Sequence, residues 1–145
     1  MWRRIAALTF TALILIPSGA HLFELPAKID LDREAYFIVQ GIYAGWAAFF
    51  MPILGAVAAN GILFAALRRH KPTKARWALL SAGLICASLA VFFTFVFPGN
   101  QATANWTMQP ENWDLLRQRW EYGHAANAVL VFAAFIATAI AAVDD

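Results

Sequence analysis

Four long apolar runs constrain this chain more than any other feature of its sequence. They cover about residues 5–23, 37–67, 77–97 and 122–143, and each is long enough to cross the hydrocarbon core of a bilayer as a helix. The chain is 61% hydrophobic and 14% charged, whereas soluble domains are roughly half apolar and a quarter charged. The sequence therefore predicts an all-α, four-span membrane bundle that forms one domain over residues 1–145.

Charge is distributed unevenly along the chain. Seven of the eleven Lys and Arg residues lie at Arg3, Arg4 and in the turn 68–76. Because Lys and Arg favour the cytoplasmic side, we expect both termini to lie in the cytoplasm and the protein to lie in a bacterial inner membrane. The connections 24–36 and 98–122 would then form a cap on the outer, periplasmic side. The basic turn is short and has no aromatic residues between its charges, so a nucleic-acid partner is not expected.

The first apolar run also resembles a signal peptide, because it follows two arginines and contains Pro17-Ser18-Gly19-Ala20. It ends, however, in His-Leu-Phe-Glu-Leu-Pro, a sequence typical of a helix terminus. We therefore expect it to be retained as the first span.

The stretch 112–131 carries a polar stripe into the last apolar run. At ~100° per residue, five of its side chains fall within one arc of a helix: Trp113, Arg117, Trp120, His124 and Asn127. Glu121 lies at the edge of this arc. The spacing predicts an outer helical extension over about 111–121 that enters the membrane as the fourth span.

Two short motifs are expected to meet at the outer end of the bundle. His21 and Glu24 form H-x-x-E at the end of the first span, and Glu121 and His124 form E-x-x-H at the start of the fourth. Residues three apart share a helix face, and imidazole with carboxylate suits iron, copper or zinc. One hypothesis is a site for a single transition-metal ion. A haem held by His21 and His124 is a less supported version of this hypothesis. The other is a hydrogen-bond network without a metal.

Further residues at this level are candidates for ligand binding. Arg117 could clamp an anionic or quinone-type oxygen. Trp113 and Trp120 either stack on a ligand or belong to the aromatic belt of the interface. Asn100 either caps a turn or donates a hydrogen bond into the site, and Tyr43 could line the same cavity.

These residues carry a resemblance to a known family. Four spans, Pro98-x-Asn100 and the entry Arg117-x-x-Trp120-x-x-x-His124 resemble the anthrone oxygenase-like family of small membrane proteins. The resemblance covers the layout of most of the chain, but its motifs occupy only the C-terminal part. It implies oxidation of a polyketide-type aromatic by molecular oxygen. It also assigns site roles to Asn100, Arg117, Trp120 and His124, but none to Glu24.

The resulting expectation is an oxidoreductase with an outward-facing polar pocket that binds a hydrophobic or aromatic small molecule. In it, His124 serves as base or metal ligand, Glu121 as ligand or orienter of the base, and Arg117 as clamp. The alternative is a lipophile-binding protein or an accessory subunit of a larger complex or homo-oligomer. Small residues suited to helix association favour this alternative, among them Ala125, Ala126, Ala133, Ala134, Ala137 and Ala141.

Overall fold

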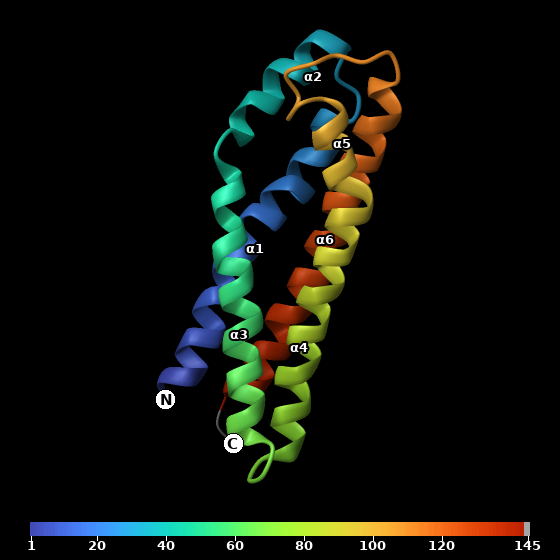
Figure 1. Cartoon of the computed structure of the whole chain (residues 1–145). Helices are drawn as coiled ribbons and strands as arrows, with labels where there is room; N and C mark the ends of the chain where they lie inside the picture. Colours follow the sequence, from blue (N-terminus) through green and yellow to red (C-terminus); the bar gives the residue numbers. More distant parts are fainter. Residues whose placement is uncertain (144–145) are drawn as a thin grey trace.

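The computed structural model describes residues 1–143 and is built from helices that run along a common axis (Figure 1). Four segments are long and apolar enough to cross a membrane: Trp2–Lys28, Trp46–Leu67, Pro72–Ala102 and Trp113–Ala142. The described part of the chain contains no strand. The prediction of an all-α four-span bundle is therefore confirmed, and the chain is an integral membrane protein.

The last helix, α6 (Trp113–Ala142), is the most buried of the four spans. It packs against α1 (Trp2–Lys28) and α4 (Pro72–Val91), while α3 (Phe50–Leu67) lies against α1 and α4. Small residues make this close packing feasible, because Ala134, Ala137 and Ala141 of α6 are buried inside the bundle. Three of the alanines that suggested association with a partner are thus used within the chain itself.

The second expected span, 37–67, is divided in the structure. A short helix, α2 (Arg33–Gln40), and a 3₁₀ turn, η1 (Gly41–Tyr43), precede a break at Gly45. Gly45 has φ +85°, a conformation that glycine adopts without the steric cost of a side chain. The chain then enters the membrane through η2 (Trp46–Phe49) and α3. The apolar run 37–67 is too long for one span, and in the structure it forms both a span and a part of the cap.

The first and third spans also end later in the chain than the sequence analysis predicted. The first helix continues through Pro26 to Lys28 instead of ending near residue 23. The third span continues beyond residue 97 through a π-helix, η3 (Phe92–Val96), and α5 (Phe97–Ala102), so Asn100 lies in a helix. The π-helix faces Gly123 of α6, where an added Cβ would approach Val96 to 2.8 Å. The expected extension 111–121 and the fourth span are one continuous helix.

The outer cap consists of α2 and the loop between α5 and α6, which lie at the end away from both termini (Figure 1). Two arginines connect its parts. Arg33 donates to the carbonyls of Gln109 and Pro110, and Arg117 donates to the carbonyl of Leu31 at 2.6 Å. The termini and the basic turn share the opposite end, as the charge pattern predicted. Which side of the membrane this end faces remains a prediction.

A neutral polar cluster, which we call the inner knot, joins the four spans. It consists of Thr11 (α1), Asn60 (α3), Ser81 (α4) and Thr138 (α6), all fully buried. Asn60 donates to Thr11 at 3.1 Å and accepts from Thr138 at 3.0 Å, and the hydroxyls of Ser81 and Thr138 are 2.7 Å apart. Asn60 therefore forms hydrogen bonds to two other helices.

Candidate acid–base site under the outer cap

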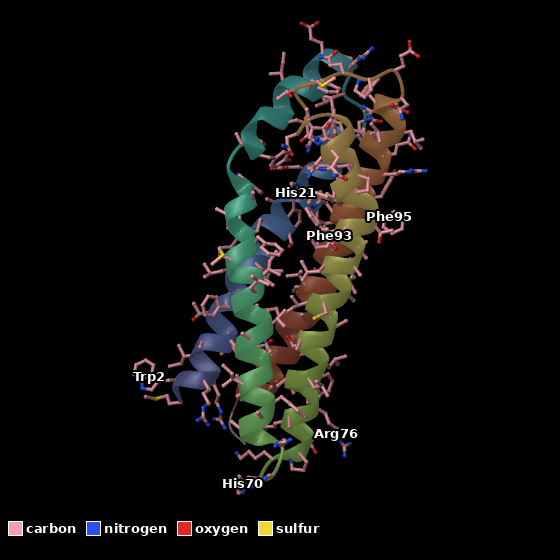
Figure 2. The ribbon with its side chains drawn as sticks, in the orientation of Figure 1. Trp2, His21, His70, Arg76, Phe93 and Phe95 are labelled. Atoms are coloured by element: carbon pink, nitrogen blue, oxygen red, sulfur yellow. The ribbon has the colours of Figure 1, made fainter. Side chains whose placement is uncertain are left out.

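The two short motifs meet in the outer half of the bundle. The rings of His21 and His124 are stacked, with centroids 3.8 Å apart and planes at 23°. Figure 2 shows His21 among the side chains beneath the cap, whereas His70 and Arg76 lie at the opposite end. His21 is buried and His124 is half-buried. The end of the first span and the start of the fourth are therefore neighbours.

An ion pair lies next to the stacked imidazoles. Lys28 Nζ is 2.9 Å from Glu121 Oε1, and the two side chains are only 4% and 0% exposed. The same carboxylate oxygen accepts a hydrogen bond from Tyr36 at 2.9 Å, and Gln40 donates to the Tyr36 hydroxyl. A buried charge is tolerated only when it is paired and hydrogen-bonded, and Glu121 meets this condition through one of its two oxygens.

A second carboxylate is linked to Lys28 through Tyr43. Lys28 donates to the Tyr43 hydroxyl at 2.7 Å, and this hydroxyl donates to Glu24, which is half-buried. Burial and the hydrogen bond to Glu24 raise the pKa of Tyr43 above its usual value. Burial and the nearby Glu121 raise the pKa of Tyr36 in the same direction. Both tyrosines therefore remain neutral phenols that can donate a hydrogen bond.

Aromatic rings enclose the Lys28 ammonium and the imidazoles. Lys28 Nζ lies 4.4 Å from the Tyr43 ring centroid and 4.6 Å from that of Trp120. Trp120 also contacts His124, with centroids 4.2 Å apart, and Trp46 contacts His21 at 5.4 Å. Cations are attracted to the faces of such rings, so the aromatic residues help to retain a charge away from water.

Asn100 fixes the position of Trp120. Its Oδ1 accepts hydrogen bonds from the indole nitrogens of Trp120 at 2.8 Å and Trp106 at 3.1 Å. Ala104, Asn105 and Trp106 have φ values of 48°, 56° and 64°. Such values are uncommon for residues other than glycine and persist when surrounding contacts hold them. Asn100 thus orients an indole beneath the cap instead of capping a turn.

Arg117 and Trp113 belong to the cap in this structure. Arg117 pairs with Asp114, donates to the Leu31 carbonyl, and lies 4.6 Å from the Trp113 ring centroid. Trp113 is partly buried against Tyr36. These contacts engage the Arg117 guanidinium with protein groups and hold the cap over the site. They give no support to the prediction that Arg117 clamps a ligand oxygen.

Several buried polar atoms near the site have no hydrogen-bond partner among the described residues. They are His21 Nδ1, Gln40 Oε1, Glu121 Oε2 and Asn127 Oδ1. Buried polar atoms are nearly always paired with protein or ordered water, so each exception requires an explanation. Asn127, on the polar stripe of the last span, contributes one of these atoms. The site therefore has hydrogen-bonding capacity that the protein itself does not satisfy.

The predicted metal ligands do not fit a shared metal ion in this conformation. Within residues 1–143, no group of three or more His, Cys, Asp or Glu side chains is arranged to hold a metal. Glu24 and Glu121 are engaged by Tyr43 and Lys28. The lone pairs of imidazole nitrogens lie in the planes of the rings. Because the two stacked rings are nearly parallel, these lone pairs do not converge on one point. The metal site and its His21–Glu24–Glu121–His124 ligand set therefore stay a prediction without support, and no reaction step is derived through a metal.

Sequence reasoning missed Lys28 and Tyr36, which complete the site. The signal for Lys28 was present, because His21, Glu24 and Lys28 are spaced i, i+3, i+7 and share one helix face. A proline at position 26 suggested that the helix had already ended, but α1 continues through it. Tyr36 had no local signal, since α2 brings it to Glu121 from a distant part of the sequence.

Comparison of the chain with protein-family models, with curated proteins and with solved structures found no match.

Proposed function

We propose that this protein is a membrane oxidoreductase that uses molecular oxygen to oxidise an enolisable aromatic ketone of the anthrone type. The observation that carries the proposal is the stacked His21–His124 pair beside the buried Lys28–Glu121 ion pair. Two imidazolium cations in contact would repel one another strongly. One of the rings is therefore available as a neutral base in a site that also holds a cation.

The chemistry divides into a proton transfer and an oxygenation. His124 removes a proton from the activated CH₂ group of the substrate, and the Lys28 ammonium stabilises the resulting enolate oxygen. The carbanionic carbon donates electrons to O₂ and forms a C–O bond, and the resulting peroxide anion takes up the proton to become a hydroperoxide. Cleavage of the O–O bond and loss of the second hydrogen as water convert CH₂ to C=O. One O₂ is consumed and one water is released for each substrate.

The surroundings of the site support this class of substrate. Trp120, Tyr43 and Trp46 offer ring faces and edges to a flat aromatic molecule, and such a molecule partitions into the bilayer that surrounds the helices. The observed cluster is packed under the cap, so binding requires the cap to move. The sequence analysis predicted an outward-facing polar pocket, whereas these residues are packed beneath the cap.

The test is oxygen consumption by the purified protein in lipid nanodiscs with an anthrone as substrate. We expect His124→Gln to lower the turnover rate by about 10²-fold or more, the usual contribution of a general base. His70→Gln is the matched control, because His70 lies exposed in the basic turn at the opposite end, and it should leave the rate unchanged. Equal rates for the two variants would refute the proposal.

The accessory-subunit alternative has less support than the sequence suggested. It relied on a stripe of small residues along α6, but the deepest of these pack within the bundle. No other observation favours it.

A further inference from the structure

The hydrogen bonds under the cap form a continuous chain whose donors diverge from Lys28. Glu121 accepts from Lys28, Lys28 donates to Tyr43, and Tyr43 donates to Glu24. The chain starts at a fully buried carboxylate and ends at a half-buried one at the outer edge of the bundle. Its donors point outward between Lys28 and Glu24, which is the arrangement needed to pass a proton toward the outer face.

We propose that Lys28, Tyr43 and Glu24 form a proton relay that connects the buried Glu121 and His124 with water at the outer face of the membrane. This relay rests on the same site as the proposed oxygenation. It needs no substrate, however, and would serve any acid–base reaction at His124.

Each step of the relay balances. An N–H bond of Lys28 breaks as a new O–H bond forms on Tyr43, whose original proton moves to Glu24. Lys28 is left as a neutral amine and recovers a proton from Glu121, if Glu121 has received one from the imidazoles. Glu24 then releases its proton to water. The raised pKa of Tyr43 means that the phenol passes a proton by receiving one while it gives one up, rather than by ionising first.

Two buried polar atoms, Glu121 Oε2 and His21 Nδ1, have no hydrogen-bond partner among the described residues. Buried polar groups without a protein partner are commonly bound by ordered water. Water bound at these atoms would extend the relay from Glu121 toward the stacked imidazoles.

The charged and titratable groups around this path come from every element packed on it. Glu24 and Lys28 belong to α1, Tyr36 to α2, Tyr43 to η1, and Glu121 and His124 to α6, with Arg117 above the Tyr36 ring. Tyr122 of α6 provides an internal comparison. It is 58% exposed and takes no part in the hydrogen bonds that link Glu121, Lys28, Tyr43 and Glu24.

The relay is tested by a rapid change from alkaline to acidic pH on the protein in nanodiscs, followed by tryptophan fluorescence. Trp120 contacts both imidazoles, and a protonated imidazole quenches a neighbouring indole. A phase that is absent from Trp120→Phe therefore reports protonation of the histidine pair. We expect Tyr43→Phe and Glu24→Gln to slow this phase by about 10²-fold, the scale of a lost proton-transfer group, with its final amplitude unchanged.

Tyr122→Phe is the matched control and should leave the rate of this phase close to that of the unaltered protein. Equal slowing in Tyr122→Phe would show that loss of any tyrosine hydroxyl perturbs the site, and would overturn the relay. Unchanged rates in Tyr43→Phe and Glu24→Gln, or no Trp120-dependent phase in the unaltered protein, would overturn it as well. Because no substrate is present, these outcomes are independent of the oxygen-consumption assay.

Discussion

The bundle contains two buried polar clusters that differ in charge and in completeness. The inner knot of Thr11, Asn60, Ser81 and Thr138 is neutral, and each of its side chains forms hydrogen bonds across helices. The outer site contains an ion pair and two imidazoles. Several of its buried polar atoms lack partners among the described residues.

This difference separates a structural role from a functional one. A neutral, paired network in an apolar bundle fixes which helix faces meet, at a modest gain in free energy. A cluster with charges and unpaired atoms costs free energy to bury, so it is retained where chemistry requires it. The same fold therefore has a neutral, paired polar cluster at one depth and, at another, a charged and incompletely paired cluster where we propose acid–base chemistry.

The largest expected effect comes from breaking the ion pair. Glu121→Leu leaves the Lys28 ammonium buried without a counter-charge, and removal of one partner of such a pair costs about 3–5 kcal/mol. The free energy of unfolding in mixed detergent micelles measures this loss. The double variant Lys28→Met with Glu121→Leu should recover most of it, because paired apolar replacements are often nearly neutral. A double variant as unstable as the single one would contradict the assignment of the cost to an unpaired charge.

A smaller effect is expected from alkaline pH. The pKa values of Tyr36 and Tyr43 are raised in the folded protein, so the neutral phenols favour the folded state. This contribution is complete below the unfolded tyrosine pKa of about 10, and each tyrosine loses up to ~1.4 kcal/mol per pH unit above it. Unfolding measured against pH should show this loss, and Tyr43→Phe should reduce its slope. An unchanged slope in that variant would argue against the burial of a neutral phenol.

The smallest effect is expected at the inner knot. Thr138→Val removes a hydroxyl that bonds Asn60 and Ser81, and inter-helix hydrogen bonds in membranes contribute about 1 kcal/mol. The free energy of unfolding should fall by about this amount, while oxygen consumption and the Trp120-dependent phase remain unchanged. A large loss of activity in this variant would show that the two clusters are coupled and would remove the distinction between them.

Much of the fold followed from the sequence because apolar length is a local property. Four runs long enough to cross a bilayer predict four helices, and the positions of Arg and Lys predict that both termini share one end with the basic turn. The polar stripe on the last span was equally local. It placed Trp120, Glu121 and His124 on one side of a helix, which is where the structure has them.

Tertiary structure decided what these residues contact. Only packing of α1 against α6 brings Lys28 to Glu121 and stacks His21 on His124. The break at Gly45 separates α3 from α2 and η1, which place Tyr36 and Tyr43 at the site. Helix periodicity specifies the face that a side chain occupies, but a partner that is distant in sequence is set by the packing of whole helices. The sequence by itself thus determined a four-span membrane protein with polar groups at its outer end. The structure decided that these groups form a closed, charged site beneath a cap.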